Sequence, residues 1–150
     1  MLSKKIFQVT DVIKSKKIKI ISFDIFDTLL AREAGESLHV FNMVEAHTGF
    51  AGFANQRKCS EVVSRKASSG HTDDTTFDEI YKRLSQEFGY SNEDIELLKA
   101  TELNIERSML RPRDSIKRIY DEAVRLSKTI IAVSDMYLPS EFLQDVLNLN

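Results

Sequence analysis

The sequence predicts an α/β protein with a parallel sheet and a long helical segment inserted after the first strand. Two short apolar runs, 17–23 and 129–134, have the composition of buried strands, and each leads into polar residues. Between about 33 and 110, apolar residues instead recur at the spacing of helices. A chain of 150 residues with 42% hydrophobic and 29% charged residues is long enough for one core with such an insertion.

The chain opens with a predicted helix at residues 3–15, one face of which carries Ile6, Val9 and Ile13. The first strand, 17–23, leads directly into Asp24. In open α/β sheets, ligands bind beyond the carboxyl ends of the strands. Asp24 is therefore expected to lie at a binding site and not in a core.

Asp27 and Thr28 follow Asp24 within one tight turn. A carboxylate at Asp24 can act as a nucleophile or bind a hard cation, and the Thr28 hydroxyl can hold an anionic oxygen. Ordinary turn residues are the alternative, because Asp and Thr are common in turns. The second strand favours the site, since it also leads into hydroxyl and carboxylate residues, Ser134 and Asp135.

The inserted segment predicts several helices separated by turns. Thr76 and Glu79 have the spacing of a capping box, which opens one helix, and Gly89 closes it. Ser91 opens the next helix, which runs toward Leu110. After the insertion, the pattern predicts a helix over 113–127, the second strand at 129–134 and a last helix that starts at Pro139 and Ser140.

The spacing of the two strands indicates where the insertion lies. Asp24 and Ser134 are 110 residues apart in the sequence, whereas a strand–helix–strand unit takes roughly 30 residues or slightly more. A segment inserted directly after the first strand emerges over the carboxyl ends of the strands, so we expect it to cover the site. A helical bundle that only packs on the sheet is the alternative.

The two strand ends, Asp-x-x-x-Thr at 24–28 and Ser-Asp at 134–135, match the first two motifs of the haloacid dehalogenase superfamily. The phrases at 23–30 and 134–139 resemble a bacterial branch of predicted hydrolases, some of which are joined to sugar-transferring domains. The resemblance implies an α/β fold with a Rossmann-like parallel-sheet core, incomplete here, and an α-helical cap inserted after the first strand. Residues 1–32 and 111–150 would form the core, and 33–110 the cap.

The resemblance also implies a Mg²⁺-dependent phosphohydrolase. Asp24 would be the nucleophile that forms an aspartyl-phosphate, and it would bind Mg²⁺ together with the backbone carbonyl of Phe26. Thr28 and Ser134 match the hydroxyl positions of the motifs. The Ser134 hydroxyl and the backbone N–H of Asp135 would hold phosphoryl oxygens. The substrate would be a small phosphorylated metabolite, with a sugar phosphate suggested by the family association alone.

Phe26 departs from the pattern of most phosphatases in this superfamily, which have a second aspartate at that position to protonate the leaving oxygen and activate water. Phenylalanine can do neither, and dehalogenase members also have an aromatic residue there. A carbon–halogen hydrolase is therefore one alternative, and a catalytically silent module that regulates a fused transferase is another. Asp27 is expected to hydrogen-bond the backbone of its turn and not to replace the missing acid.

Other polar residues have weaker claims to a role. Arg32 follows the first motif and would reach a substrate anion under the cap, with a surface position as the alternative. Arg111 and Arg113 flank Pro112 at the return from the insertion and are hinge candidates only. Cys59 has no activating neighbourhood in the sequence, which favours a packed helix residue.

Composition argues against several classes of protein. The net charge of −2 shows no basic excess, which argues against nucleic acid as the main partner. No apolar run approaches the roughly 20 residues of a membrane span. The single cysteine suits the cytoplasm, where disulfides are rare.

The superfamily has two further motifs, a lysine and an acidic pair, after the second strand. Because the sequence stops sixteen residues past Ser134, we expect it to be the front part of a longer protein, with a fused downstream domain among the candidates. The 150-residue chain is then expected to bind Mg²⁺ weakly, to be inactive as a phosphatase by itself and to self-associate through its two-stranded sheet.

Overall fold

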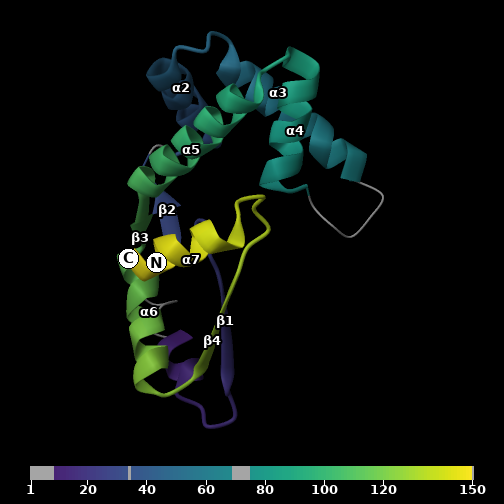
Figure 1. Ribbon diagram of the computed structural model, residues 1–150. Helices are drawn as coiled ribbons and strands as arrows, with labels where there is room; N and C mark the ends of the chain where they lie inside the picture. Colours follow the sequence, from purple (N-terminus) through teal and green to yellow (C-terminus); the bar gives the residue numbers. More distant parts are fainter. Residues whose placement is uncertain (1–8, 34, 69–74, 150) are drawn as a thin grey trace. The chain divides into compact units, whose positions relative to one another are not determined.

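The computed structural model, which describes residues 9–33, 35–68 and 75–149, is a mixed α/β chain (Figure 1). It divides into two compact units. The strand unit contains the described residues of 1–31 and 111–134, and the helical unit those of 32–110 and 135–150. Each unit has its own buried residues.

The strand unit is built on two parallel strands, β1 (Ile20–Asp24) and β4 (Thr129–Val133), which run side by side in Figure 1. In their register, Ile20 lies opposite Thr129 and Asp24 lies opposite Val133. Both predicted strands and their parallel pairing are confirmed. Residues 9–13 are helical, and the remainder of the predicted leading helix lies outside the described residues.

One face of this sheet is covered and the other is open. Helix α6 (Asp114–Arg125) covers one face, where its Ile119 forms a small core with Ile13 and Phe23. On the opposite face, the exposed fractions of three large apolar side chains stay high, at 58% for Ile20, 44% for Ile131 and 48% for Val133. The expectation that this part of the chain exposes apolar surface is confirmed.

We expect the chain to self-associate through this open sheet. Among the described residues β1 and β4 pair only with each other, so each strand leaves one edge without a strand partner, and unprotected apolar edges promote association. Ile131→Lys should shift the apparent mass toward the monomer in light scattering across a concentration series. Val62→Lys is the matched control, because Val62 is also 44% exposed but lies in the helical unit. Equal effects of both variants would contradict this prediction.

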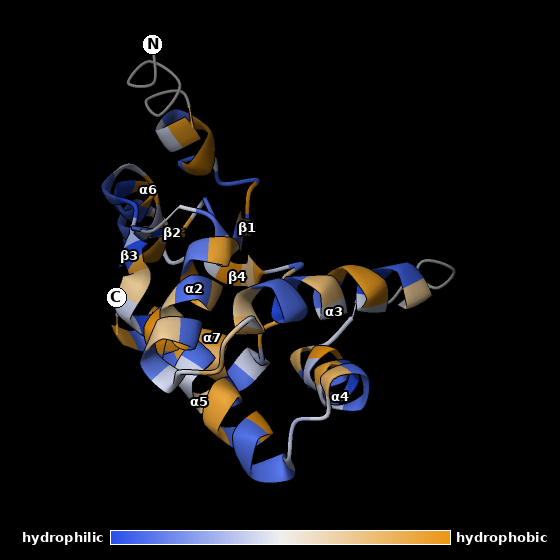
Figure 2. Ribbon diagram, turned by 90° about the horizontal axis from the view of Figure 1, so that it is seen from above, coloured by the Kyte–Doolittle hydropathy of each residue, from blue (hydrophilic) through white to orange (hydrophobic). Residues whose placement is uncertain are grey.

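The helical unit contains α2 (Ser37–Thr48), α3 (Phe53–Ser68), α4 (Phe77–Phe88), α5 (Asn92–Met109) and α7 (Ser140–Leu149). The predicted capping box of Thr76 and Glu79 is present, and Gly89 ends α4 at a positive φ of 75° that glycine adopts readily. Ser91 forms a second capping box at the start of α5. Figure 2 shows hydrophobic and hydrophilic residues on different sides of α4, as expected for a helix with one buried face.

A buried ion pair lies inside the helical unit. The guanidinium of Arg57 donates from Nε and Nη2 to the two carboxylate oxygens of Glu102, each at 2.9 Å, and neither residue is exposed to solvent. Tyr81 donates its hydroxyl to the same carboxylate at 2.8 Å. The guanidinium carbon also lies 4.6 Å from the ring centroid of Phe41 and 4.9 Å from that of Tyr137. Burial raises the pKa of Glu102, whereas the Arg57 guanidinium and the hydrogen bonds lower it.

Residues 135–150 differ from the predicted division, because they belong to the helical unit and not to the strand unit. The Phe77 N–H donates to the carbonyl of Tyr137 at 2.9 Å, and the two rings stack with their centroids 6.3 Å apart. Phe142 of α7 packs under the guanidinium of Arg107 of α5. These contacts explain why the segment after the second strand groups with the helices.

Two short strands were not predicted. β2 (Leu30–Arg32) and β3 (Leu110–Pro112) pair with each other where the chain passes from the strand unit to the helical unit and back. Cys59 lies on helix α3, as predicted, but the prediction that its side chain is packed was wrong, because it is exposed. Within the described part of the chain, the helices are too short or too polar to cross a membrane.

Candidate functional site

Asp24 and Ser134 lie at the same end of two neighbouring strands. Asp24 is the last residue of β1 and pairs with Val133, the last residue of β4, and Ser134 follows directly. The Ile25 N–H donates to the Val133 carbonyl at 2.9 Å, which extends the pairing one step beyond the strands. Asp24 is exposed and Ser134 half-buried. Both residues therefore lie at the carboxyl edge of the sheet, where α/β proteins bind ligands.

A compact loop brings Thr28 back onto Asp24. The Leu29 N–H donates to the Asp24 carbonyl at 3.2 Å, and the Leu30 N–H donates to the Ile25 carbonyl at 2.9 Å. The Thr28 hydroxyl then donates to Oδ2 of Asp24 at 2.9 Å. Among the described residues, no donor reaches Oδ1 of Asp24. Oδ1 is thus the oxygen that can attack an electrophile or bind a cation.

Arg113 contacts this loop on both sides of Thr28. Its guanidinium donates to the carbonyl of Asp27, and its backbone N–H donates to the carbonyl of Leu29 at 2.9 Å. Sequence reasoning made Arg113 only a hinge candidate, because no pattern links it to a loop more than 80 residues earlier in the chain.

Asp27 has a different role from the predicted one. Its backbone φ of 55° lies in the left-handed region, which is uncommon for residues other than glycine but more frequent for Asp. Within the described residues its carboxylate makes no hydrogen bond to the turn, and it is the carbonyl of Asp27 that is bound. The prediction that the Asp27 side chain hydrogen-bonds the backbone of its turn is therefore wrong. Asp27 contributes to the loop through its left-handed backbone conformation.

The side chain of Phe26 is buried, with 9% of its surface exposed. Its backbone forms an isolated bridge with Leu30 in the same loop. The residue at this position therefore contributes packing and a backbone carbonyl, and no acidic group.

Arg32 and Asp135 lie at the boundaries between the two units. Arg32 belongs to the helical unit, where its guanidinium makes three hydrogen bonds of 2.8–3.0 Å to the carboxylate of Glu106. The Glu106 side chain is 1% exposed, so this pair is largely shielded from water. The structure thus gives Arg32 a strong internal partner. Asp135 is exposed and begins the segment that belongs to the helical unit.

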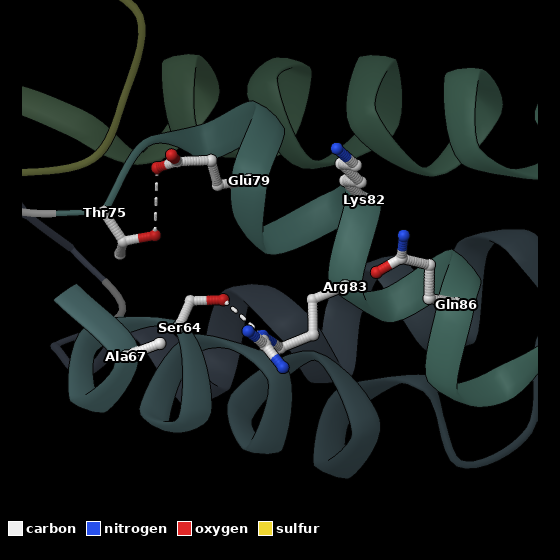
Figure 3. Close-up of a pocket in the computed structure, with 7 residues that line it drawn as sticks. All are labelled: Ser64, Ala67, Thr75, Glu79, Lys82, Arg83 and Gln86. Carbon is white, nitrogen blue, oxygen red and sulfur yellow. Dashed lines mark hydrogen bonds between the residues drawn. The ribbon is translucent and has the colours of Figure 1, made fainter.

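A pocket of about 300 Å³ lies within the helical unit, between α3 and α4 (Figure 3). Arg83 points from α4 toward α3 and donates to the Ser64 hydroxyl at 3.1 Å, while its Nη1 pairs with Glu87 at 3.2 Å. Lys82 and Glu79 also line the pocket, so charges of both signs surround it. It contains neither of the strand-end motifs.

The oxygen donors at the strand ends suit a hard cation but are few. Nowhere in the described ranges do three or more His, Cys, Asp or Glu side chains gather as a metal site. Mg²⁺ prefers oxygen ligands, keeps several waters and is often bound by one or two carboxylates together with substrate phosphate. Asp24 and the Phe26 carbonyl would fit such a site, with phosphate and water supplying the other ligands.

No protein-family model matches the chain, and no curated protein matches it. The resemblance to the haloacid dehalogenase superfamily therefore rests on the residues of the two strand ends.

Proposed function

We propose that this protein is a Mg²⁺-dependent phosphohydrolase of the haloacid dehalogenase type, in which Asp24 forms an aspartyl-phosphate. The observation that carries the proposal is the arrangement of the strand ends. Asp24 ends one parallel strand, the neighbouring strand leads into Ser134, and the Thr28 hydroxyl binds Oδ2 of Asp24. A carboxylate nucleophile with hydroxyl donors beside it is the minimum needed to attack a phosphoryl group.

In the proposed reaction, Oδ1 of Asp24 attacks phosphorus in line with the leaving oxygen. The bond from phosphorus to that oxygen breaks, and its electron pair leaves on the oxygen as an alkoxide or carboxylate, which takes its proton from solvent. The hydroxyl of Ser134 and the N–H of Asp135 would donate to the phosphoryl oxygens, and the Thr28 hydroxyl would turn from Oδ2 of Asp24 to a phosphoryl oxygen. Water then attacks the phosphorus of the aspartyl-phosphate, releases inorganic phosphate and restores the Asp24 carboxylate. Mg²⁺, when bound by Asp24 and the Phe26 carbonyl, would neutralise phosphate charge.

The proposal extends to the architecture and the substrate. The strand unit would be part of a Rossmann-like core, and the helical unit, which begins soon after the Asp24 loop, would act as a cap that excludes water. A small phosphorylated metabolite is the substrate class we propose, with a sugar phosphate suggested only by the family resemblance. The cytoplasm is the proposed compartment.

Phosphorylation of Asp24 by acetyl phosphate tests the proposal. We expect incorporation of one phosphoryl group at a high concentration of Mg²⁺, which the chain is expected to bind weakly, detected by intact-protein mass spectrometry after rapid acid quench. This single transfer does not require the complete turnover that the chain by itself is expected to lack. Asp24→Asn should abolish it, because the amide is a poor nucleophile. Asp27→Asn is the matched control and should keep it, since Asn also tolerates a positive φ. Labelling that survives Asp24→Asn, or labelling that never occurs, would contradict the proposal.

Phe26 favours a second candidate, a carbon–halogen hydrolase, because halide leaves without a proton and no acid is needed at this position. That reaction would release halide from a small haloacid without Mg²⁺ and would also depend on Asp24. A silent module that regulates a fused transferase would give neither phosphoryl transfer nor halide release. Phosphoryl incorporation, halide release or the lack of both therefore separates the three possibilities.

A further inference from the structure

We infer that Arg113 is a positioning residue that holds the loop after β1 so that the Thr28 hydroxyl faces Asp24. The inference rests on the proposed function only for what Thr28 does to a substrate. The geometry itself lies entirely within the strand unit, which contains both the loop and Arg113.

The two contacts of Arg113 lie on either side of Thr28. The guanidinium binds the carbonyl of Asp27, the residue before Thr28, and the backbone N–H binds the carbonyl of Leu29, the residue after it. The Thr28 hydroxyl then reaches Oδ2 of Asp24 at 2.9 Å. Arg113 thus fixes the peptide group directly before Thr28 and the one between Leu29 and Leu30, which limits the directions in which the Thr28 side chain can point.

The backbone conformation of the loop explains why it needs a contact from the side chain of Arg113. Asp27 is in the left-handed region, an unfavourable conformation for most residues that the surroundings must stabilise. A hydrogen bond from a charged donor to the Asp27 carbonyl is such a stabilising contact, and it is stronger than one between neutral groups.

The start of helix α6 does not explain why residue 113 has an arginine side chain. Arg113 is the N-cap residue of α6, but its side chain makes no capping hydrogen bond. Its carbonyl accepts from the N–H groups of Ile116 and Lys117 at 2.9 Å, which any residue would do equally well. Within the described residues, the acceptor that the guanidinium finds is the Asp27 carbonyl.

The test compares Arg113→Gln and Arg113→Lys with Arg118→Gln, which changes an exposed arginine of α6. The first measurement is the Thr28 χ1 rotamer, read from three-bond couplings in NMR of the full chain without any ligand. We expect one rotamer in the wild type and in Arg118→Gln, and averaging in Arg113→Gln, with added guanidinium chloride at low concentration restoring the single rotamer. Arg113→Lys keeps a charged donor and should give an intermediate result.

The second measurement is the rate of Asp24 phosphorylation by acetyl phosphate, which should fall about 2- to 10-fold in Arg113→Gln, the range expected for one lost hydrogen bond. Thr28 averaging in Arg113→Gln without any phosphorylation of the wild type would leave the positioning role intact and remove the proposed function. An unchanged Thr28 rotamer in both Arg113 variants would overturn the inference, whatever the phosphorylation rate. If Arg113→Gln does not fold, the rotamer in Arg113→Lys decides in the same way.

Discussion

Replacing Glu102 with glutamine is expected to lower the free energy of unfolding of the helical unit by about 1.5–3 kcal/mol, the usual contribution of a hydrogen bond to a charged group. The change removes the negative charge but keeps the shape of the side chain, so the counter-charge that remains for Arg57 is the carboxylate of Glu61, 3.3 Å from its Nη1 and 20% exposed. The loss is larger than at a surface pair because Arg57 and Glu102 are both shielded from water. Both side chains are 0% exposed, so no solvent can replace the lost partner.

The other groups around Arg57 compensate only partly for the loss of the Glu102 carboxylate. Two ring faces, those of Phe41 and Tyr137, lie within 5 Å of its guanidinium carbon. They contribute cation–π attraction but accept no strong hydrogen bond, so they offer only partial compensation. Local rearrangement is restricted as well, since the Tyr81 hydroxyl is bound to the same carboxylate.

Urea denaturation followed by circular dichroism measures the effect. Glu96→Gln is the matched control on the same helix, because the Glu96 side chain is 75% exposed and its loss should change stability little. The double variant Arg57→Met/Glu102→Leu should recover much of the lost stability, since apolar pairs often replace buried ion pairs without cost. Equal midpoints for Glu102→Gln and Glu96→Gln would contradict the prediction.

The sequence predicted those elements whose signals are local. The apolar runs at β1 and β4 and the signals that open helices at Thr76 and Ser91 act within a few residues, and the structure has these elements where they were expected. β2 and β3 escaped prediction, because three-residue strands such as Leu30–Arg32 are too short to show any periodicity. Their pairing depends on a partner strand far away in the chain.

Local sequence patterns could not predict contacts between residues that are far apart in the chain. Periodicity shows that α7 has an apolar face but does not say what that face packs against, so it could not show that residues 135–149 group with the helices. Arg57 and Glu102 are 45 residues apart, and either would be exposed in most helices. At the candidate site, the sequence predicted Asp24, Thr28 and Ser134 from the strand ends, and it missed the contacts of Arg113 for the same reason.

Leaving-group dependence is the second large effect that we expect, and it follows from Phe26. No acid stands at this position to protonate a departing oxygen, and such proton transfer commonly contributes about 10²–10⁴ in rate. Phosphorylation of Asp24 by acetyl or aryl phosphates, whose leaving groups depart as stable anions, should therefore exceed that by alkyl phosphates by roughly this factor. Quenched-flow mass spectrometry of the intact chain with acetyl phosphate, p-nitrophenyl phosphate and glycerol 3-phosphate gives the three rates.

An acid added to the solution distinguishes two causes of slow phosphorylation by alkyl phosphates: the missing acid at position 26 and the low intrinsic reactivity of these esters. Imidazolium buffer, raised in concentration at constant pH and ionic strength, should accelerate the alkyl phosphate and leave the aryl phosphate unchanged. Phe26→Asp would supply an acid at this position, but Phe26 is only 9% exposed, and a carboxylate there would lie in apolar surroundings. We therefore expect that variant to lose stability, which makes the buffer series the better test. Equal rates with aryl and alkyl phosphates in the wild type would show that the missing acid does not limit the reaction.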